Sequence, residues 1–344
     1  MGEQYVLSWR IAMFAISVVL AAFIYHVIEN PIRHGRLLTL KGSLLRGYAS
    51  LLVVTIAMFV VVSENNGLPS RFPSEVIRLA SYVNDKSPPL ADCAFVGQTL
   101  SDTASFCRIG RSTETPRWLI YGDSHAWAAH AAFDKWLQLK GEAGLFMYRN
   151  SCPPVIGVHV FADKGGCFAF NRSVADFLAR NVDIGNVVLV STWRQAVEAR
   201  LSTSERVQLS KADSVALFDA KFSETLAYLN SVGKRVYVWE PVPGATERVP
   251  IAMARALLED RPTGIELSRD RYRAENDFFF SALEKNRRYI ALSFSPSDAL
   301  CTTGRCAVAI DGNPAYFDNA HVTQSSSDFW ARMMERRERE AGMP

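Results

Sequence analysis

Hydrophobic residues follow two different patterns along this chain of 344 residues. Two long and almost uninterrupted apolar runs lie near the N terminus, at residues 6–28 and 44–62. Each run is long enough to cross a bilayer as a helix, for which about 20 apolar residues suffice. From Trp118 onward, short apolar runs alternate with amphipathic stretches of helical length. That alternation is typical of a mostly parallel sheet covered by helices on both faces.

The alternating region predicts an α/β domain with five strands and five long helices. We expect the strands at residues 118–121, 145–148, 187–191, 235–240 and 289–294. We expect the helices at residues 124–139, 168–181, 212–232, 268–286 and 324–340. In open sheets of this kind, functional sites form at the carboxyl ends of the strands.

Composition changes between the two regions. Residues 65–115 are rich in Pro, Ser and Asn, which predicts a linker with little regular structure that packs on the following domain. We therefore divide the chain into a two-span hairpin at residues 1–64, a linker at 65–115 and a globular domain at 116–344. The apolar content of 49% is sufficient for both a membrane segment and one ordinary core.

Charged residues beside the apolar runs predict an orientation. Five basic or histidine residues lie between the runs or at the start of the second run, namely Arg33, His34, Arg36, Lys41 and Arg46. The outer flanks instead carry Glu3 and Glu64, so the positive-inside rule places the connector in the cytoplasm and the globular domain outside. A signal peptide is disfavoured because the first run is too long, lacks a clearly basic flank and is followed by a second run.

Overall charge argues against a nucleic-acid partner. The chain has 38 basic and 35 acidic residues, for a net charge of +3. It has no run of Lys and Arg interleaved with aromatic residues that would follow a phosphate backbone.

Cysteines support an oxidising compartment. The six residues form three locally spaced couples, Cys93 with Cys107, Cys152 with Cys167, and Cys301 with Cys306. An even number beside membrane spans favours disulfides between sequence neighbours. Buried free thiols remain the alternative. A zinc site is disfavoured because no histidine lies at ligand spacing from a cysteine couple.

The most informative motif is the apolar run that ends in Gly-Asp-Ser-His at residues 122–125. A strand would carry Ser124 to the edge of the sheet, Gly122 would allow a tight turn, and the N–H groups of the next helix would face a developing anion. Ser124 is therefore a candidate nucleophile. Its structural alternative is a serine that only caps the helix. We expect Asp123 to cap the helix or brace the turn.

A candidate general base lies almost two hundred residues later, in Tyr-Phe-Asp-Asn-Ala-His at residues 316–321. The spacing of Asp318 and His321 lets a carboxylate hold Nδ1–H while Nε2 accepts the serine proton. The alternatives are a surface histidine and an Asx turn. His130 should face elsewhere on its helix, and His125 is expected to contact substrate or to pack. No His, Asp and Glu cluster suggests a metal.

The early Gly-Asp-Ser and the late Asp-x-x-His together resemble the SGNH hydrolase superfamily. Gly-Asp-Ser-His-Ala, the Cys-Pro-Pro at residues 152–154, the Tyr-Phe-Asp-x-x-His ending and the two upstream spans resemble the C-terminal part of bacterial acyltransferase-3 proteins with a fused periplasmic SGNH domain. The resemblance implies a three-layer αβα catalytic domain in the periplasm, after two transmembrane helices of the inner membrane. It also implies O-acetylation of a polysaccharide such as lipopolysaccharide O-antigen through a serine acyl-enzyme.

The oxyanion hole departs from the pattern of this superfamily. SGNH enzymes usually add a glycine and an asparagine from the second and third strand ends, and neither is plainly present here. The candidate donors are the Ser124 N–H, the Asn150 side chain or a backbone N–H beside it, and the Trp193 Nε1–H. Trp193 could instead be a core or sugar-stacking residue, and Trp127 and Trp239 are further candidates for a glycan platform.

The resemblance also sets expectations for partners. It implies no bound cofactor, and an acyl group derived from acetyl-CoA that is handled by a larger membrane bundle. This chain begins after the early spans of that bundle, so we expect either a fragment or a separate polypeptide that supplies them. The alternatives to transfer are an acyl-esterase with the same triad and a non-catalytic glycan-docking domain. The intact Ser124, Asp318 and His321 argue against a silent domain.

Overall fold

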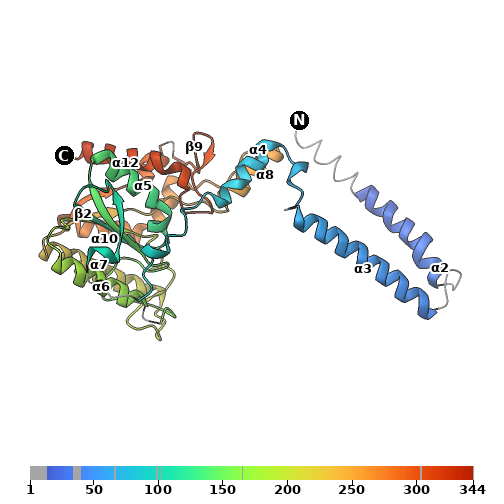
Figure 1. Cartoon of the computed structure of the whole chain (residues 1–344), viewed down its shortest axis with the longest axis horizontal. Helices are drawn as coiled ribbons and strands as arrows, with labels where there is room; N and C mark the ends of the chain where they lie inside the picture. Colours follow the sequence, from blue (N-terminus) through green and yellow to red (C-terminus); the bar gives the residue numbers. More distant parts are fainter. Residues whose placement is uncertain are drawn as a thin grey trace. The chain divides into compact units, whose positions relative to one another are not determined.

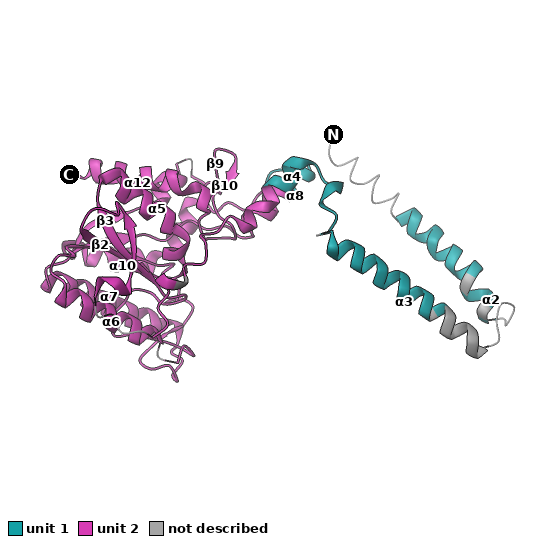
Figure 2. Cartoon of the chain, viewed as in Figure 1, with its two compact units in different colours: residues 1–78, 255–262 teal, residues 79–254, 263–344 magenta. Residues whose placement is uncertain are grey.

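The computed structural model of the chain describes residues 14–33, 40–65, 67–97, 100, 102–164, 166–302 and 304–343 (Figure 1). The chain divides into two compact units (Figure 2). The first comprises residues 1–78 with 255–262, and the second comprises residues 79–254 with 263–344. The second unit therefore includes most of the segment that the sequence predicts as a linker.

The first unit is helical. A helix at residues 14–24 continues into η1 (Tyr25–Glu29) and α2 (Asn30–Arg33), and α3 (Leu40–Glu64), η2 (Pro69–Arg71) and most of α4 (Ser74–Ser81) follow. Large apolar side chains of α3, including those of Leu51 and Phe59, are exposed. Among the described residues, no helix is both long enough and apolar enough to cross a membrane. The predicted span at 44–62 lies within α3, and residues 6–13 of the other predicted span fall outside the described residues.

The second unit is built on a six-stranded sheet. In spatial order its strands are β1 (Cys107–Gly110), β3 (Ala143–Tyr148), β2 (Pro116–Gly122), β5 (Asn186–Val190), β7 (Arg235–Trp239) and β8 (Ile290–Phe294). All neighbours are parallel except β1, which pairs antiparallel with β3. Two short antiparallel pairs lie apart from this sheet, β4 (His159–Val160) with β6 (Leu201–Ser202) and β9 (Ala309–Ile310) with β10 (Asn313–Pro314).

Helices cover both faces of the sheet. One face carries α5 (Ser124–Lys140) and α12 (Ser327–Glu340), and the other carries α6 (Gly166–Arg180), α7 (Lys211–Ser231) and α10 (Asp277–Lys285) (Figure 1). The remaining helices are α8 (Val249–Leu258), α9 (Arg269–Glu275) and α11 (Pro296–Leu300). Short turns lie at η3 (Tyr82–Asn84), η4 (Ala91–Cys93), η5 (Thr103–Ser105), η6 (Arg287–Tyr289) and η7 (Gln324–Ser326). The predicted α/β architecture with a mostly parallel sheet is confirmed.

The sheet has a hydrophobic core on each face, because side chains alternate between the two faces along each strand. In β2, Trp118 and Ile120 pack in one core, and Leu119 and Tyr121 pack in the other. Both faces are buried under helices, so the strand reads as a continuous apolar run rather than an alternating one.

Several elements differ from the prediction. β1 lies within the predicted linker, because the Cys93–Cys107 disulfide and its pairing with β3 hold this segment on the sheet. The helix predicted at residues 268–286 is broken at Asn276, which ends α9 and begins α10. The Asn276 side chain donates to the Tyr272 carbonyl oxygen at 2.8 Å. α8 was not predicted from the sequence.

Three disulfides are present, and each joins the neighbours in sequence that were expected to pair. They are Cys93–Cys107, Cys152–Cys167 and Cys301–Cys306. The last two pairs are buried in the second unit. Each disulfide restricts the unfolded chain, and the restriction grows with the length of the loop that it closes.

We expect the two buried disulfides to differ in their contribution to stability. The Cys152–Cys167 pair is 15 residues apart and the Cys301–Cys306 pair is 5 residues apart. Replacing both cysteines of a pair with alanine should lower the free energy of unfolding by about 3 kcal/mol for the first and about 2 kcal/mol for the second. Denaturant titration of both double variants measures the difference, and a larger loss for the Cys301–Cys306 variant would contradict the loop-length argument.

Candidate active site

The turn between β2 and α5 places Ser124 at the first position of a helix. Gly122 is required at the end of β2, because a Cβ atom there would overlap the carbonyl oxygen of Val190 on the neighbouring strand. Asp123 caps the helix, as expected, and its Oδ1 accepts from the backbone N–H of His125 at 2.8 Å. The strand, the close approach and the cap together fix the position of the Ser124 hydroxyl.

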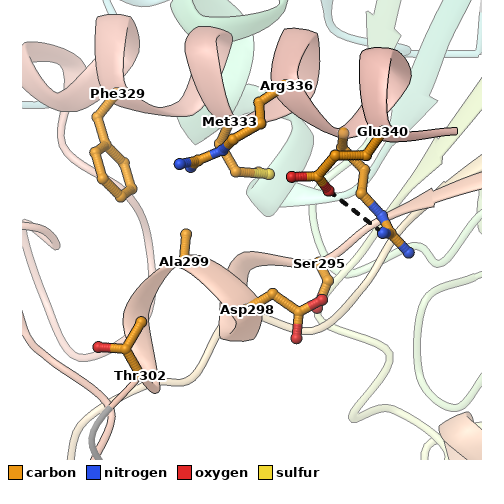
Figure 3. Close-up of a pocket in the computed structure, with 9 residues that line it drawn as sticks. Ser295, Asp298, Ala299, Thr302, Phe329, Met333, Arg336 and Glu340 are labelled. Carbon is orange, nitrogen blue, oxygen red and sulfur yellow. Dashed lines mark ion pairs between the residues drawn. The ribbon is translucent and has the colours of Figure 1, made fainter. Parts of the chain in front are cut away.

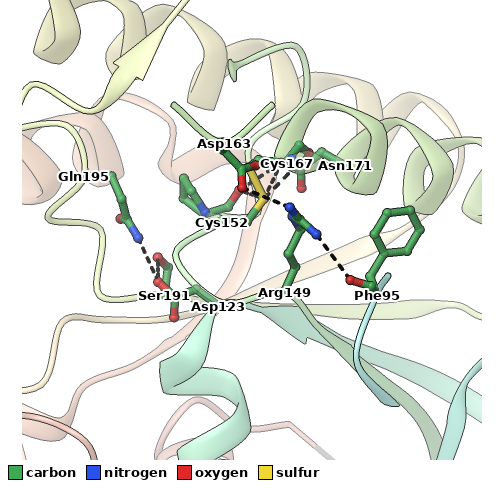
Figure 4. The surroundings of a disulfide bond; sticks show 10 residues. Phe95, Asp123, Arg149, Cys152, Asp163, Cys167, Asn171, Ser191 and Gln195 are labelled. Atoms are coloured by element: carbon green, nitrogen blue, oxygen red, sulfur yellow. Dashed lines mark hydrogen bonds and ion pairs between the residues drawn. A yellow bond between two sulfur atoms is a disulfide. The ribbon is translucent and has the colours of Figure 1, made fainter. Parts of the chain in front are cut away.

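The other oxygen of the Asp123 carboxylate binds the segment that follows β5 (Figure 4). Asp123 Oδ2 accepts from Ser191 Oγ at 2.6 Å, from the Thr192 backbone N–H at 3.1 Å and from Gln195 Nε2 at 3.1 Å. The side chain is fully buried, so these donors replace the water that a carboxylate would otherwise bind. These hydrogen bonds join the carboxyl ends of the neighbouring parallel strands β2 and β5 beside Ser124. Sequence analysis did not identify Ser191 or Gln195.

Ser124, His321 and Asp318 form a continuous hydrogen-bonded relay. His321 Nε2 lies 2.8 Å from Ser124 Oγ, and His321 Nδ1 lies 2.7 Å from Asp318 Oδ2. Asp318 Oδ1 accepts from the backbone N–H groups of Ala320 at 2.9 Å and of His321 at 2.8 Å. The three side chains singled out as nucleophile, base and orienting acid therefore meet in space. Their distances suit proton transfer from the serine to the imidazole.

Asp318 is held in its ionised form. Burial alone would raise the pKa of this carboxyl. The hydrogen bond and charge of His321, together with the backbone N–H groups of Ala320 and His321, outweigh burial and lower the pKa to about 2. An ionised Asp318 stabilises His321 with its proton on Nδ1, which leaves Nε2 to accept from the serine.

Two further rings contact His321. The Phe317 ring stacks nearly parallel to it, with centroids 5.4 Å apart and an interplanar angle of 10°. The His125 ring lies with its centroid 4.4 Å away. These contacts restrict rotation of the His321 imidazole, as pre-organised proton transfer requires. Phe317 could have been found from the sequence, since it immediately precedes Asp318.

His125 is buried beside the relay and is uncharged near neutral pH. Burial lowers its pKa to about 4, and the neighbouring His321 acts in the same direction against the opposing charges of Asp123 and Asp318. Its backbone N–H is donated to Asp123. Of the two roles expected for His125, substrate contact or packing, the structure shows packing against the His321 ring.

Trp193 does not supply an oxyanion donor. Its Nε1–H is donated to the carbonyl oxygen of Trp239 at 2.9 Å, and its ring is buried against Phe222 and Phe279. Its backbone has a φ of 61°, and its backbone N–H is donated to Ser191 Oγ at 3.1 Å. Trp193 is therefore a core residue, which is one of the roles that the sequence left open for it.

The other candidates differ in exposure. Asn150 is exposed on the turn after β3, and no hydrogen bond joins it to the relay among the described residues. Trp239 is buried, so it offers no surface to a glycan. Trp127 is half-buried and lies edge-on to Phe317, with centroids 5.9 Å apart. Of the three tryptophans considered as a glycan platform, only Trp127 reaches the surface near the relay.

A cavity of about 350 Å³ adjoins the relay. Its lining includes His125, Asn319 and Ala320, each of which is next in sequence to a member of the relay. A second cavity of about 310 Å³ lies between α11 and α12, with Asp298, Met333 and Arg336 among its lining residues (Figure 3). Neither lining includes a member of the relay itself, but only the first includes residues that flank the relay in sequence, so the first cavity is the one beside it.

The described residues contain no group of three or more His, Cys, Asp and Glu side chains that could hold a metal ion.

The position of His125 predicts a pH-dependent loss of stability. The unfolded state binds a proton at an ordinary histidine pKa near 6.5, whereas the folded state resists it until about pH 4. The free energy of unfolding should therefore fall as the pH is lowered from 7 to 4.5, by roughly 2–3 kcal/mol from this residue. Urea titrations of wild type and His125→Gln across this range measure the difference. An equally steep fall in both proteins would show that His125 does not cause it.

Solved structures provide the first comparison with known proteins. The periplasmic domain of a lipopolysaccharide acetyltransferase from Salmonella ser. Paratyphi A matches with a TM-score of 0.53 and 18% identity, over 76% of this chain and 96% of that one. A putative acylhydrolase from Bacteroides fragilis NCTC 9343 matches with a TM-score of 0.37 and 11% identity, over 69% of this chain and 92% of that one. The first likeness shows a shared fold. No curated protein matches the sequence.

Family membership is shown by the sequence over the second unit. The family described as the SGNH domain fused to AT3 domains matches residues 92–336. The match spans the β2–α5 turn with Ser124 and the segment with Asp318 and His321, and it does not include the first 91 residues. This chain therefore belongs to the family of SGNH domains that are fused to AT3 domains.

Proposed function

We propose that this chain transfers an acyl group, most simply acetyl, to a hydroxyl of a cell-surface polysaccharide such as lipopolysaccharide O-antigen. One observation carries the proposal: the hydrogen-bonded relay in which Ser124 Oγ lies 2.8 Å from His321 Nε2 and His321 Nδ1 lies 2.7 Å from Asp318. Family membership and the acetyltransferase named for the Salmonella structure support this choice of reaction and substrate. No bound cofactor takes part in the proposed steps.

In the first half-reaction, Ser124 takes the acyl group from an ester or thioester donor. Ser124 Oγ attacks the acyl carbonyl carbon while its proton passes to His321 Nε2, and Asp318 stabilises the imidazolium that forms. The leaving alcohol or thiol then takes that proton as its bond to the acyl carbon breaks. The Ser124 N–H at the start of α5 and a group near Asn150 are the proposed oxyanion donors. The donor carries an acetyl group derived from acetyl-CoA, delivered by the membrane bundle of an AT3 protein.

In the second half-reaction, a sugar hydroxyl takes the place of water. His321 Nε2 accepts the hydroxyl proton as the sugar oxygen attacks the acyl carbon, and the proton returns to Ser124 Oγ as the acyl-enzyme bond breaks. Donors at the oxyanion are typically worth about 2.7–4 kcal/mol each. A sparse oxyanion hole slows attack by unbound water, and a bound acceptor recovers the rate because the cavity holds it beside the serine.

We also propose that the chain acts at the bacterial inner membrane with its second unit in the periplasm. The exposed apolar side chains of the first unit, among them Phe14, Leu51 and Phe59, support contact with lipid. Three disulfides in the second unit support an oxidising compartment. The two apolar runs at residues 6–28 and 44–62 are the proposed membrane segments, and further helices of the acyltransferase are the proposed partners.

Incubation with an acetyl ester, with and without an oligosaccharide acceptor, tests the proposed reaction. We expect acetylated sugar to form in the presence of the acceptor, and Ser124→Ala to lower its formation about 10⁴-fold or more because the nucleophile is lost. Mass spectrometry and chromatography separate the products. Ser231→Ala, which removes an exposed hydroxyl at the end of α7, is the matched control and should leave the rate unchanged.

Two results of this experiment count against transfer. Free acetate as the sole product, in the presence of acceptor, would make the chain an esterase that uses the same relay. Equal activity of wild type and Ser124→Ala would contradict the assigned nucleophile, and absence of product with both proteins would favour a non-catalytic docking role.

Cell fractionation tests the proposed location. The full chain, expressed in a Gram-negative bacterium, should stay with the membranes after alkaline carbonate washing, because apolar contact with lipid is insensitive to pH. Protease added to spheroplasts should reach the second unit. Recovery in the wash, or protection of the second unit from the protease, would contradict the assignment.

A further inference from the structure

One wall of the cavity beside the relay carries two arginine and two glutamate side chains. Arg194 and Glu198 lie in the segment after β5, and Arg271 and Glu275 lie on α9, and all four line the cavity. Glu275 links the two segments, since its Oε2 lies 3.7 Å from Arg194 Nη1 and its Oε1 accepts from Arg271 Nε at 2.8 Å. Arg194 Nε also lies 3.4 Å from Glu198 Oε1. Glu275 is therefore the carboxylate shared by both arginines.

The balance of charge in this wall constrains the ligand. Two guanidinium groups and two carboxylates carry no net charge, and each arginine already has an acidic partner. A phosphate or carboxylate group would have to compete with those partners for the arginines. A sugar hydroxyl both donates and accepts, so it can bind to a paired carboxylate and a guanidinium at once. The wall suits an uncharged ligand with several hydroxyl groups.

Access to the wall is open. The Arg194 side chain is 46% exposed, and those of Arg271 and Glu275 are 58% and 33% exposed. Each therefore keeps N–H groups or lone pairs free to meet a ligand in addition to their mutual contacts. The cavity volume of about 350 Å³ falls at the lower end of the range for ligand sites, about 300–1,000 Å³.

The cavity also borders the residues that flank the relay. Its lining includes Thr192, whose N–H is fixed by Asp123, and Ala320, whose N–H is fixed by Asp318. His125 adds an imidazole that is uncharged near neutral pH and contacts the His321 ring. The part of the cavity lined by His125 and Ala320 is therefore the part nearest to His321. An acetyl group is much smaller than this volume, so the space is better matched to the acceptor than to the transferred group.

We propose that this cavity is the acceptor subsite, and that Glu275 and Arg194 select an uncharged sugar unit by hydrogen bonding to its hydroxyl groups. The role of the cavity as an acceptor subsite rests on the proposed acyl transfer. Binding of sugar to the cavity is measured without that reaction. Glu275 is the most sensitive position, because its replacement by glutamine removes the carboxylate charge that strengthens hydrogen bonds from ligand hydroxyls and releases both arginines at once. His125 closes the end of the subsite nearest to the relay.

Direct binding of sugars provides the first test. The probes are the methyl glycosides of glucose, galactose, mannose and rhamnose, each titrated into the full chain and followed by ligand-observed NMR, with methyl glucuronoside and methyl galacturonoside as anionic counterparts. At least one neutral glycoside should bind more tightly than either anionic one. Glu275→Gln should weaken that binding about tenfold. Arg194→Gln is a second variant that weakens it by removing a guanidinium donor, and thermal unfolding verifies that both variants fold.

Glu284→Gln is the matched control. Glu284 forms an exposed ion pair with Arg287, 3.6 Å apart, away from the lining of this cavity, and its substitution should leave sugar binding unchanged. Tighter binding of the uronic acid glycosides, absence of binding by every neutral probe, or equal binding by wild type and Glu275→Gln would overturn the assignment of the subsite.

Kinetics with a neutral acceptor provide the second test. In Glu275→Gln, the KM for the acceptor should rise about tenfold, and the products should shift from acetylated sugar towards free acetate. A change in kcat with no change in the acceptor KM would overturn the assignment. A wild-type protein that binds neutral sugar through Glu275 but forms no acetylated product would instead overturn the proposed transfer and leave the sugar site in place.

Discussion

The buried carboxylate of Asp123 is the constraint on which the rest of the site depends. It accepts hydrogen bonds from the His125 backbone on one side and from Ser191, Thr192 and Gln195 on the other. A fully buried carboxylate is costly unless its lone pairs are satisfied, so the helix start and the β5 exit have little freedom to separate. Ser124 is thereby fixed before any substrate arrives. The same contacts position the segment that carries Arg194.

The relay depends on a second, local constraint. The turn at residues 318–321 folds back on itself, so that one carboxylate oxygen accepts two backbone N–H groups and the other accepts from the imidazole of the same turn. Asp318 and His321 thus form a preassembled unit that needs to meet only one hydroxyl. The two units come from chain segments 197 residues apart, and backbone hydrogen bonds from Ala245 and Val249, in the segment after β7, hold the unit of Asp318 and His321 in place. Chemistry is therefore divided between a fixed nucleophile and a fixed base.

Sequence reasoning succeeded where the signal is local. The Gly-Asp-Ser-His turn, the Asp-x-x-His turn, the disulfide couples and the positions of the parallel strands all follow from neighbours in the chain. It failed where partners are distant. The Trp193 ring turns inward because Trp239, on the neighbouring strand, accepts its N–H, and nothing near residue 193 indicates that contact. The antiparallel β1 and the bridging role of Glu275 depend likewise on segments that meet only in the folded chain.

Formation of an acyl-enzyme distinguishes catalytic acyl transfer from non-catalytic glycan binding. The most direct measurement is rapid quenching of the full chain with an acetyl ester donor in the absence of acceptor, followed by peptide mass spectrometry. The account predicts one acetyl group on the peptide that contains Ser124, formed at neutral pH and removed when a neutral oligosaccharide is added. An unmodified Ser124 peptide under conditions in which donor is consumed, or an acetyl group on another residue, would contradict it.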